Sequence, residues 1–390
     1  MSQTLSAQEA VCRLLAATWD PQTLPAAASI PWPEVLRLAG PGNVGGVVHV
    51  VSREMRATMP GDVREALEQA FYRTAAANAL CLHQLAEVRA GLAATGAPLL
   101  LLKGAALAEA LYGDAALRQI GDIDLAVPVE AVPACRQALL EMGYVSGQVE
   151  ERPGSLLAYS NEELFLPPPS HPTPVELHWH ILDVPYYLHK VPMDWFWEHS
   201  ESLPVAGGPF RVLSSEANLI YLPAHLALHH GFHGWHSLLD LALLIVQTHD
   251  RLDWDRIGDT AQAFDLLCVL RATLERLARC WPSLPLDEAR AAVQARTPSR
   301  IDARLFRLLT AESRSNPLNW YTTLMSLPGL GTRARFVWTY LFPGGAYMRQ
   351  RYGVAADWQL PYWYAVRLAG GLGRLARALP RARRLDRGRA

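Results

Sequence analysis

The feature that most constrains the fold is a set of short strand-like segments between long helical ones. The segment GDIDLAV, residues 121–127, alternates polar and apolar side chains, and VELHWH, residues 175–180, alternates in the same way. A period of two is typical of a strand with one buried face, whereas the flanking sequence repeats its apolar residues every three or four positions, as helices do. The chain therefore predicts an α+β protein whose few strands are embedded among helices.

Pro and Gly residues divide the chain into four expected regions. Residues 1–95 form a helical N-terminal region, with helices predicted over 6–19 and 63–92. Residues 96–214 carry the strands, 215–300 form a helical domain packing on them, and 301–390 are helical with an Arg-rich tail. Within the second region we predict strands over 98–102 and 122–127, helices over 105–113 and 134–142, and a hairpin of 164–166 with 175–181.

Composition favours an ordered protein of the cytoplasm. Half of the residues are hydrophobic and 19% are charged, which separates this chain from disordered proteins. The five cysteines are odd in number and contain no CxxC pair, as expected in a reducing compartment. The N-terminus does not resemble a signal peptide, and no apolar run approaches the roughly 20 residues of a spanning helix.

Two strand-like segments place acidic side chains on strand faces. In the first, Asp122 and Asp124 lie two apart and point to one face, while Ile123, Leu125 and Val127 point to the core. Adjacent carboxylates are unfavourable without a cation, and one or two Mg²⁺ ions bridging to nucleotide phosphates are the usual solution, with Mn²⁺ as the alternative ion. The plainer alternative for Asp-x-Asp is a turn or a helix cap.

In the second segment, VELHWH, the alternation places Glu176, His178 and His180 on one face. Glu176 is therefore a candidate third metal ligand, or a group that accepts the proton of an attacking hydroxyl. The plainer alternative for Glu176 is an exposed charge on the face of a strand. We assign His178 to nucleotide binding because it shares this face.

Upstream of the acidic pair, LLLLKGAALAEALYG predicts a strand, a tight turn and a helix. Gly104 at such a turn lets backbone N–H groups approach a phosphate, helped by the positive end of the helix. Lys103 adds an ammonium group, and Arg118 adds a guanidinium that suits phosphate oxygens. The plainer alternative for Lys103 is a charge extending to solvent from a strand end.

The ordered combination KGAALAEALYGDAALRQIGDIDLAV followed by VELHWH resembles the uncharacterised nucleotidyltransferase family of the DNA polymerase β superfamily. The resemblance covers about residues 95–250. It implies a small mixed sheet of the polymerase β type flanked by helices, Mg²⁺-dependent NTP binding, and Asp122, Asp124 and Glu176 as the metal-binding acids. The wider superfamily has Gly-Ser where this chain has Gly104-Ala105, so Lys103 and Arg118 must supply more of the phosphate contact.

Five histidines, at 225, 229, 230, 233 and 236, lie in AHLALHHGFHGWHSLLDLA. This segment has no HExxH motif and no Cys partner, so a dedicated zinc site is not expected. With the resemblance, we expect one helix that packs beside the core and lends His229, His233 and Asp240 to the nucleotide-binding cleft. The alternative is that these are ordinary groups of a helix face.

The chain ends with a strongly basic segment. Residues 367–390 contain eight arginines and one aspartate, about +7, and the total charge of −1 leaves about −8 on residues 1–366. Arginines interspersed with Leu and Ala predict a short amphipathic helix for an acidic partner or a membrane surface. No specific nucleic acid is expected, because no aromatic residues alternate with these arginines.

These observations lead to one main hypothesis, an enzyme of the nucleotidyltransferase class (EC 2.7.7-like). It would move a nucleoside monophosphate from an NTP to a hydroxyl or phosphate acceptor, in a natural-product, peptide-modification or polysaccharide pathway as the resemblance implies. Attack at the γ-phosphorus would make the same site a kinase. The same residues are also compatible with a non-catalytic nucleotide-binding accessory protein and with a toxin-like transferase, and the sequence does not name the acceptor.

Overall fold

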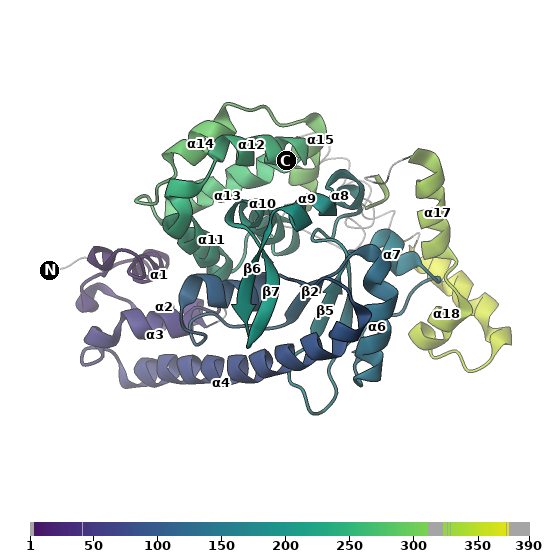
Figure 1. Cartoon of the computed structure of the whole chain (residues 1–390), viewed down its shortest axis with the longest axis horizontal. Helices are drawn as coiled ribbons and strands as arrows, with labels where there is room; N and C mark the ends of the chain where they lie inside the picture. Colours follow the sequence, from purple (N-terminus) through teal and green to yellow (C-terminus); the bar gives the residue numbers. More distant parts are fainter. Residues whose placement is uncertain are drawn as a thin grey trace.

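The strands form one mixed seven-stranded sheet in the order β3-β4-β5-β2-β1-β7-β6. The computed structural model describes residues 4–40, 42–310, 323–325, 327, 329–371 and 373. The strands are β1 (Leu100–Leu101), β2 (Ile123–Ala126), β3 (Val145–Ser146), β4 (Glu162–Leu166), β5 (Val175–His178), β6 (Ser200–Val205) and β7 (Gly208–Leu213). Helices surround the sheet (Figure 1), so the α+β class is confirmed.

Helices account for most of the remaining structure. The α-helices are α1 (Ala7–Ala16), α2 (Trp32–Ala39), α3 (Gly45–Val51), α4 (Gly61–Leu92), α5 (Lys103–Leu107), α6 (Val132–Glu141), α7 (Ser155–Tyr159), α8 (Pro185–Lys190), α9 (Met193–Glu198), α10 (Ser215–Ala224), α11 (Trp235–Thr248), α12 (Trp254–Ala263), α13 (Leu267–Cys280), α14 (Asp287–Gln294), α15 (Arg300–Leu309), α17 (Gly329–Leu341) and α18 (Gly345–Tyr352). Two wider, π-helical turns, Ala108–Tyr112 and His225–His229, continue α5 and α10.

The predicted strands are present, with shifted ends. The hairpin of β4 and β5 is confirmed as an antiparallel pair, although β5 ends at His178 instead of 181. Strand β2 lies parallel to β5, and β1 lies antiparallel to β2 and parallel to β7. The β6–β7 hairpin was not predicted, because Pro204 and Pro209 interrupt its pattern. Pro204 is tolerated because β6 is an edge strand, and Pro209 lies outside the part of β7 that pairs with β1.

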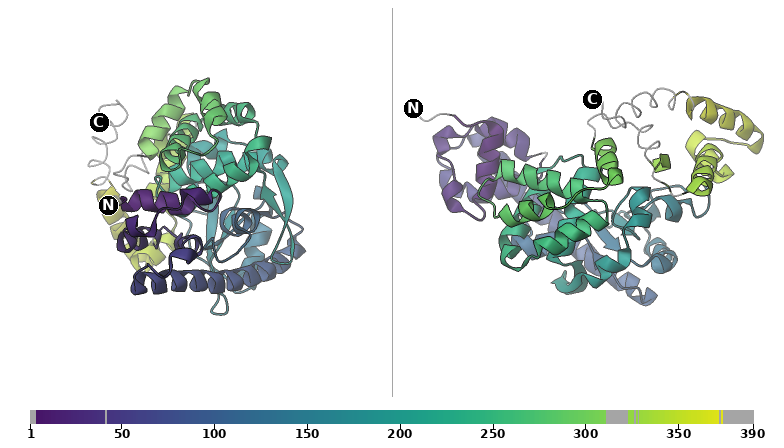
Figure 2. Two further views of the ribbon diagram at one scale, coloured as in Figure 1. Left: turned by 90° about the vertical axis from the view of Figure 1, so that its left-hand side faces the viewer. Right: turned by 90° about the horizontal axis from the view of Figure 1, so that it is seen from above.

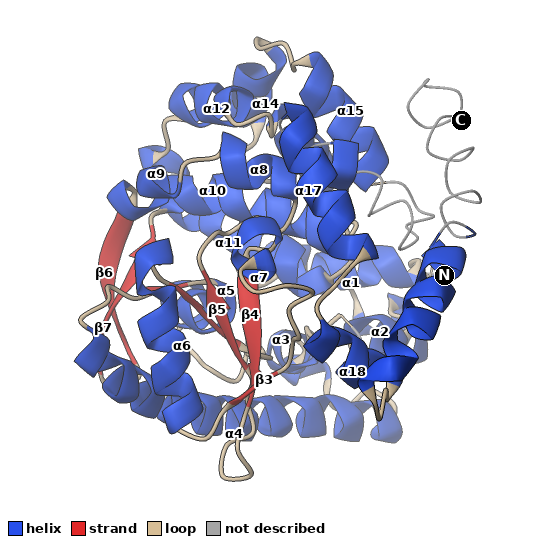
Figure 3. Cartoon of the chain, turned by 90° about the vertical axis from the view of Figure 1, so that its right-hand side faces the viewer, coloured by secondary structure: helices blue, strands red, loops and turns tan. Residues whose placement is uncertain are grey.

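Each face of the sheet packs against its own group of helices. One core joins Ile123, Leu125 and Val127 of the β2 segment to α4 and α6, as the alternation predicted. Figure 3 shows the long helix α4 running beneath the strands. The other core joins Leu100, Leu102 and Ala126 to the N-terminal helices and to α10–α13. The acidic side of β2 thus faces the second group of helices.

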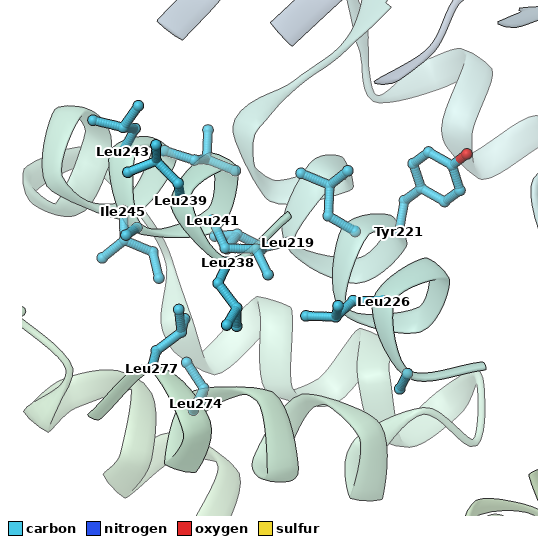
Figure 4. Packing of buried hydrophobic residues seen from close by; sticks show 14 of the residues in the cluster. Leu219, Tyr221, Leu226, Leu238, Leu239, Leu241, Leu243, Ile245, Leu274 and Leu277 are labelled. Atoms are coloured by element: carbon cyan, nitrogen blue, oxygen red, sulfur yellow. The ribbon is translucent and has the colours of Figure 1, made fainter. Parts of the chain in front are cut away.

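Leucines hold that second group together. The side chains between α10, α11 and α13 include Leu219, Leu238, Leu241, Leu274 and Leu277, all nearly inaccessible to solvent. Figure 4 shows them gathered between the helices, while the ring of Tyr221 points away from them. One face of α10 therefore packs in this leucine core, whereas the Tyr221 side chain lines the site described below.

Helix α4 also fixes two loops by buried amide side chains. Asn78 donates to the carbonyls of Ala115 and Arg118 and accepts from the N–H of Ile120 at 3.0 Å. Six residues later, Gln84 donates to the Thr173 carbonyl at 2.6 Å and accepts from its N–H at 3.1 Å. These loops lead directly into β2 and β5, so α4 sets the start of both strands that carry the acidic residues.

The C-terminal helices α17 and α18 lie at one end of the molecule (Figure 2), next to α7, as the labels of Figure 1 show. Arg152, which precedes α7, donates to the carbonyl of Phe342 at 2.7 Å and so joins this end to the sheet region. The basic tail predicted over 367–390 falls largely outside the described residues, because 372 and 374–390 are not among them. In the described part of the chain, no helix combines the length and apolar character needed to span a membrane.

Replacing Asn78 by alanine tests the role of α4. Two carbonyls and one N–H of the buried loop would lose their partner, so Asn78→Ala should lower the free energy of unfolding by about 3 kcal/mol in urea denaturation. The matched control is Gln69→Ala, an exposed amide on the same helix, with an expected change below about 0.5 kcal/mol. Equal losses in the two variants would contradict the assigned role.

Candidate functional site

The candidate site lies where β2 and β5 run side by side. The register of this parallel pair places Asp124 directly beside Glu176, so the two carboxylates share one face of the sheet. Asp124 is inaccessible to solvent, whereas the Glu176 side chain is 22% exposed. The convergence of these two acids, which come from segments 52 positions apart, is therefore built by strand pairing.

Asp124 is held between two cations. Its Oδ1 lies 2.8 Å from Lys103 Nζ and accepts a hydrogen bond from His178 Nε2 at 3.0 Å. Burial alone would raise the pKa of Asp124, but Lys103 and His178 outweigh that effect and hold the pKa well below its usual value. The other oxygen, Oδ2, is buried and has no hydrogen-bond partner among the described residues. A buried charged oxygen without a partner is unfavourable.

His178 connects Asp124 to two further carboxylates. Its Nε2 lies 3.6 Å from Glu176 Oε2, and its Nδ1 lies 3.1 Å from Glu162 Oε2. Burial lowers the pKa of His178, but the hydrogen bonds to Asp124 and Glu176 and the charge of Glu162 together raise it to about 9. Without another cation, His178 is therefore an imidazolium at neutral pH.

Lys103 is the first residue of α5 and has an unusual backbone conformation. Its φ of 42° is left-handed, which side chains other than glycine rarely adopt. This conformation turns the chain from β1 into α5 and brings the ammonium group to Asp124, with Glu176 at 3.9 Å. The Tyr221 phenol of α10 lies near it as well and is buried. Backbone strain of this kind is typical of functional sites.

Asp122 is placed differently from Asp124. It precedes β2, which begins at Ile123, and it is only partly buried. Among the described residues, Asp124, Glu176 and His178 form what we call the acidic group, in which one possible metal-ligand atom of each residue lies within 4.8 Å of the others. Asp122 is outside the acidic group. Burial, and next the charge of Asp124, raise the pKa of Asp122 to about 7. The pKa of Asp122 is therefore raised, whereas that of Asp124 is lowered.

Arg118 and Asp240 form a buried ion pair. Arg118 Nη2 lies 3.0 Å from Asp240 Oδ2, and Tyr112 donates to Asp240 Oδ1 at 2.6 Å. A methyl group built on Gly104 would lie 3.8 Å from Arg118 Nη1, so the guanidinium adjoins the turn that the sequence predicted for phosphate. Asp240 thus fixes the orientation of Arg118 and does not reach the acidic group itself.

The histidine-rich segment is not one continuous helix, which corrects the prediction for His233. Gly231, Phe232 and Gly234 have positive φ values of 57°, 64° and 117°, and they separate the π-helical turn from α11. His229 and His233 therefore do not share a helix face. His233 lines a different pocket, beside Cys12 and Cys280.

His229 is part of the candidate site. It lines a small pocket with Lys103, Glu176 and His178, and its Nδ1 lies 3.5 Å from Asp183 Oδ2. The hydrogen bond to Asp183 raises the pKa of His229. His225 lines the same pocket and stacks on His229 with ring centroids 5.0 Å apart. The π-helical turn, a feature often found at functional sites, produces this arrangement.

A larger cleft lies elsewhere, with a volume of about 1440 Å³. It is lined by residues of α7, α8, α9 and α17 together with Trp179 and His180. None of the candidate site residues lines it. We therefore assign the chemistry to the smaller pocket around Lys103, where charged groups converge.

Sequence reasoning missed Glu162, Tyr221 and Asp183. Glu162 was detectable, because extending the predicted hairpin by two residues before Leu164 pairs Glu162 with His178. Tyr221 and Asp183 gave no such signal, since each reaches the pocket only through the packing of α10 and the loop after β5.

Lys103→Met tests whether the ammonium group balances the buried carboxylate. The variant leaves Asp124 buried with one cationic partner fewer, so its free energy of unfolding should fall by about 3 kcal/mol in EDTA at pH 8. The matched control is Lys190→Met, whose side chain is 38% exposed and lies 3.6 Å from Asp265, with an expected loss below about 1 kcal/mol. An equal loss in both variants would show that Asp124 does not depend on Lys103.

Asp122→Asn tests the raised pKa. The folded chain binds this proton more tightly than the unfolded chain, so the stability it confers is full below about pH 4 and is lost as the pH rises through about 7. Relative to wild type, Asp122→Asn in EDTA should therefore gain about 2–3 kcal/mol between pH 5 and pH 8 in urea denaturation, from 1.36 kcal/mol per unit. Asp250→Asn, at an exposed aspartate, should show no such trend. A difference independent of pH would rule out this titration.

Comparisons with known proteins identify the family of this chain. The sequence profile of a family described as uncharacterised nucleotidyltransferase matches residues 28–282, which include every residue of the acidic group. Searches of curated proteins and of solved structures gave no significant match. The resemblance in the sequence is thereby confirmed, and a match over more than half of the chain shows that this protein belongs to the uncharacterised nucleotidyltransferase family.

Proposed function

We propose that the protein is a metal-dependent nucleotidyltransferase that transfers a nucleoside monophosphate from an NTP to a hydroxyl or phosphate acceptor. The observation that carries this proposal is Asp124 Oδ2, a buried carboxylate oxygen with no partner among the described residues, in the group with Glu176 and His178. Such an oxygen suits a divalent cation. The proposed core is of the polymerase β type, with Asp122, Asp124 and Glu176 as its acids.

The carboxylates of the site are suitable ligands for a divalent cation. Asp124 and Glu176 would hold it, and Asp122 would join them on deprotonation. A bound Mg²⁺ or Mn²⁺ ion would neutralise charge on the transferring phosphoryl group and lower the pKa of an attacking hydroxyl.

The triphosphate is proposed to lie over the turn between β1 and α5. Lys103 supplies an ammonium group, Gly104 allows close approach to the backbone, and Arg118 adjoins that turn while Asp240 orients it. His178 and His229 would border the bound nucleotide from β5 and from the π-helical turn. Catalysis then rests on positioning and charge stabilisation.

In the proposed reaction, an oxygen of the acceptor attacks the α-phosphorus. The bond between that phosphorus and the bridging oxygen to the β-phosphorus breaks, and pyrophosphate leaves. Glu176, the more exposed acid of the group, is placed to receive the proton of the attacking hydroxyl. Lys103 lies between Asp124 and Glu176 and can stabilise the charge on the leaving pyrophosphate.

Labelled nucleotides test this reaction. With each NTP labelled at the α- or the γ-phosphate, wild type with candidate acceptors should release pyrophosphate and transfer only the α-label. Asp124→Asn should reduce that rate by about 10³-fold, and Glu176→Gln provides a second variant at a less buried position. Asp250→Asn is the control. Transfer of the γ-label would indicate a kinase, and NTP binding without release of either group would favour an accessory protein.

The chain has two lysines, Lys103 and Lys190, so the phosphate position can be tested separately. An NTP acyl phosphate acylates a lysine beside its terminal phosphate. We expect labelling at Lys103, suppressed by excess NTP, although Lys190 has the more exposed side chain at 38% against 13%. Peptide mass spectrometry measures the ratio. Predominant labelling of Lys190, or labelling that NTP does not suppress, would contradict the proposed phosphate site.

A further inference from the structure

The imidazole of His178 lies in the acidic group in the position of a metal ligand. Its Nε2 points at Asp124 Oδ1 at 3.0 Å and at Glu176 Oε2 at 3.6 Å. The side chain is 1% exposed, and the position is fixed by strand β5, where His178 shares a face with Glu176. One imidazole nitrogen and oxygens of two carboxylates therefore lie within 4.8 Å of one another.

The opposite nitrogen of His178 is oriented by a separate carboxylate. Nδ1 lies 3.1 Å from Glu162 Oε2, and Asn161 Nδ2 donates to the same oxygen at 2.9 Å. Strand pairing supports this contact, since Glu162 is the direct cross-strand neighbour of His178. A histidine that binds a metal through one nitrogen almost always donates its other N–H to a carboxylate, a carbonyl or water. Glu162 meets that requirement.

We propose that His178 is a protein ligand of the metal together with Asp124 and Glu176, and that the Nε2 proton now donated to Asp124 leaves to solvent when the metal binds. Glu162 orients the imidazole, and the site consequently selects Mn²⁺ over Mg²⁺. This inference rests on the metal site of the proposed function and not on turnover. Mg²⁺ binds oxygen almost exclusively and keeps much of its water, whereas first-row transition ions accept imidazole. A mixed set of two carboxylates and one imidazole fits Mn²⁺ better.

The unpartnered oxygen of Asp124 supports the same conclusion. Lys103 and His178 both contact Oδ1, which leaves Oδ2 open to a further cation. A purely structural role for His178 would be complete with the three ion pairs that it already makes. It would give no reason for a buried oxygen of Asp124 to remain without a partner.

Pulsed EPR of bound Mn²⁺ tests the ligand directly on the full-length protein. We expect nitrogen modulation from wild type carrying Mn²⁺, with frequencies that change on uniform ¹⁵N labelling. His178→Gln should lose the modulation. The matched control, His249→Gln, replaces a partly exposed histidine outside the site and should keep it. Bound Mn²⁺ without nitrogen modulation in wild type would overturn the proposal, and that measurement does not depend on how any variant folds.

Metal affinities provide the second measurement, made by calorimetry without nucleotide. Wild type should bind Mn²⁺ at least about tenfold more tightly than Mg²⁺. His178→Gln should weaken Mn²⁺ binding about 10- to 100-fold and Glu162→Gln about tenfold, with Mg²⁺ binding changed less than threefold in each. Equal losses for both ions would overturn the selectivity. Nitrogen ligation without nucleotidyl transfer would contradict only the proposed reaction. Nucleotidyl transfer without nitrogen ligation would contradict only the assignment of His178 as a metal ligand.

Discussion

The structure depends on keeping the carboxylate of Asp124 charged inside the protein. A buried carboxylate is strongly unfavourable unless cations and hydrogen bonds compensate. Lys103 and His178 provide that compensation at 2.8 and 3.0 Å, and each requires a special arrangement. Lys103 adopts a left-handed backbone conformation, and the Nδ1 of His178 contacts the carboxylate of Glu162. The strained turn after β1 and the pairing of β4 with β5 both position groups that compensate this one buried charge.

This arrangement needs strands that begin at defined positions, and helix α4 provides them from a distance. Its two buried amides, Asn78 and Gln84, hold the loops that lead into β2 and β5. A shift of either strand by one residue would turn its acid to the opposite face of the sheet. The N-terminal helical region is therefore part of the site's construction, which agrees with a family match that begins at residue 28.

The second group of helices closes the site from the other side. Leucines of α10, α11 and α13 form its core, while Tyr221 and the π-helical turn after α10 face the pocket. Here local pattern and final structure disagree most. The histidine-rich segment has helical spacing, yet positive φ values at 231, 232 and 234 break it. Two of these residues are glycines, which adopt positive φ values readily. The interruption of the helix is therefore compatible with the sequence, although the spacing of the histidines did not predict it.

The class of fold, the strands that carry the acids and the family could be predicted from the amino-acid sequence. Period-two alternation and the order of Lys103, Arg118, Asp124 and Glu176 can be recognised along the chain without knowledge of its fold. Which of these groups contact one another depends on the folded chain. Strand register brought Glu176 and His178 to Asp124 in place of Asp122, and helix packing gave Arg118 its partner Asp240. Such contacts join residues more than 50 positions apart, and no local pattern encodes them.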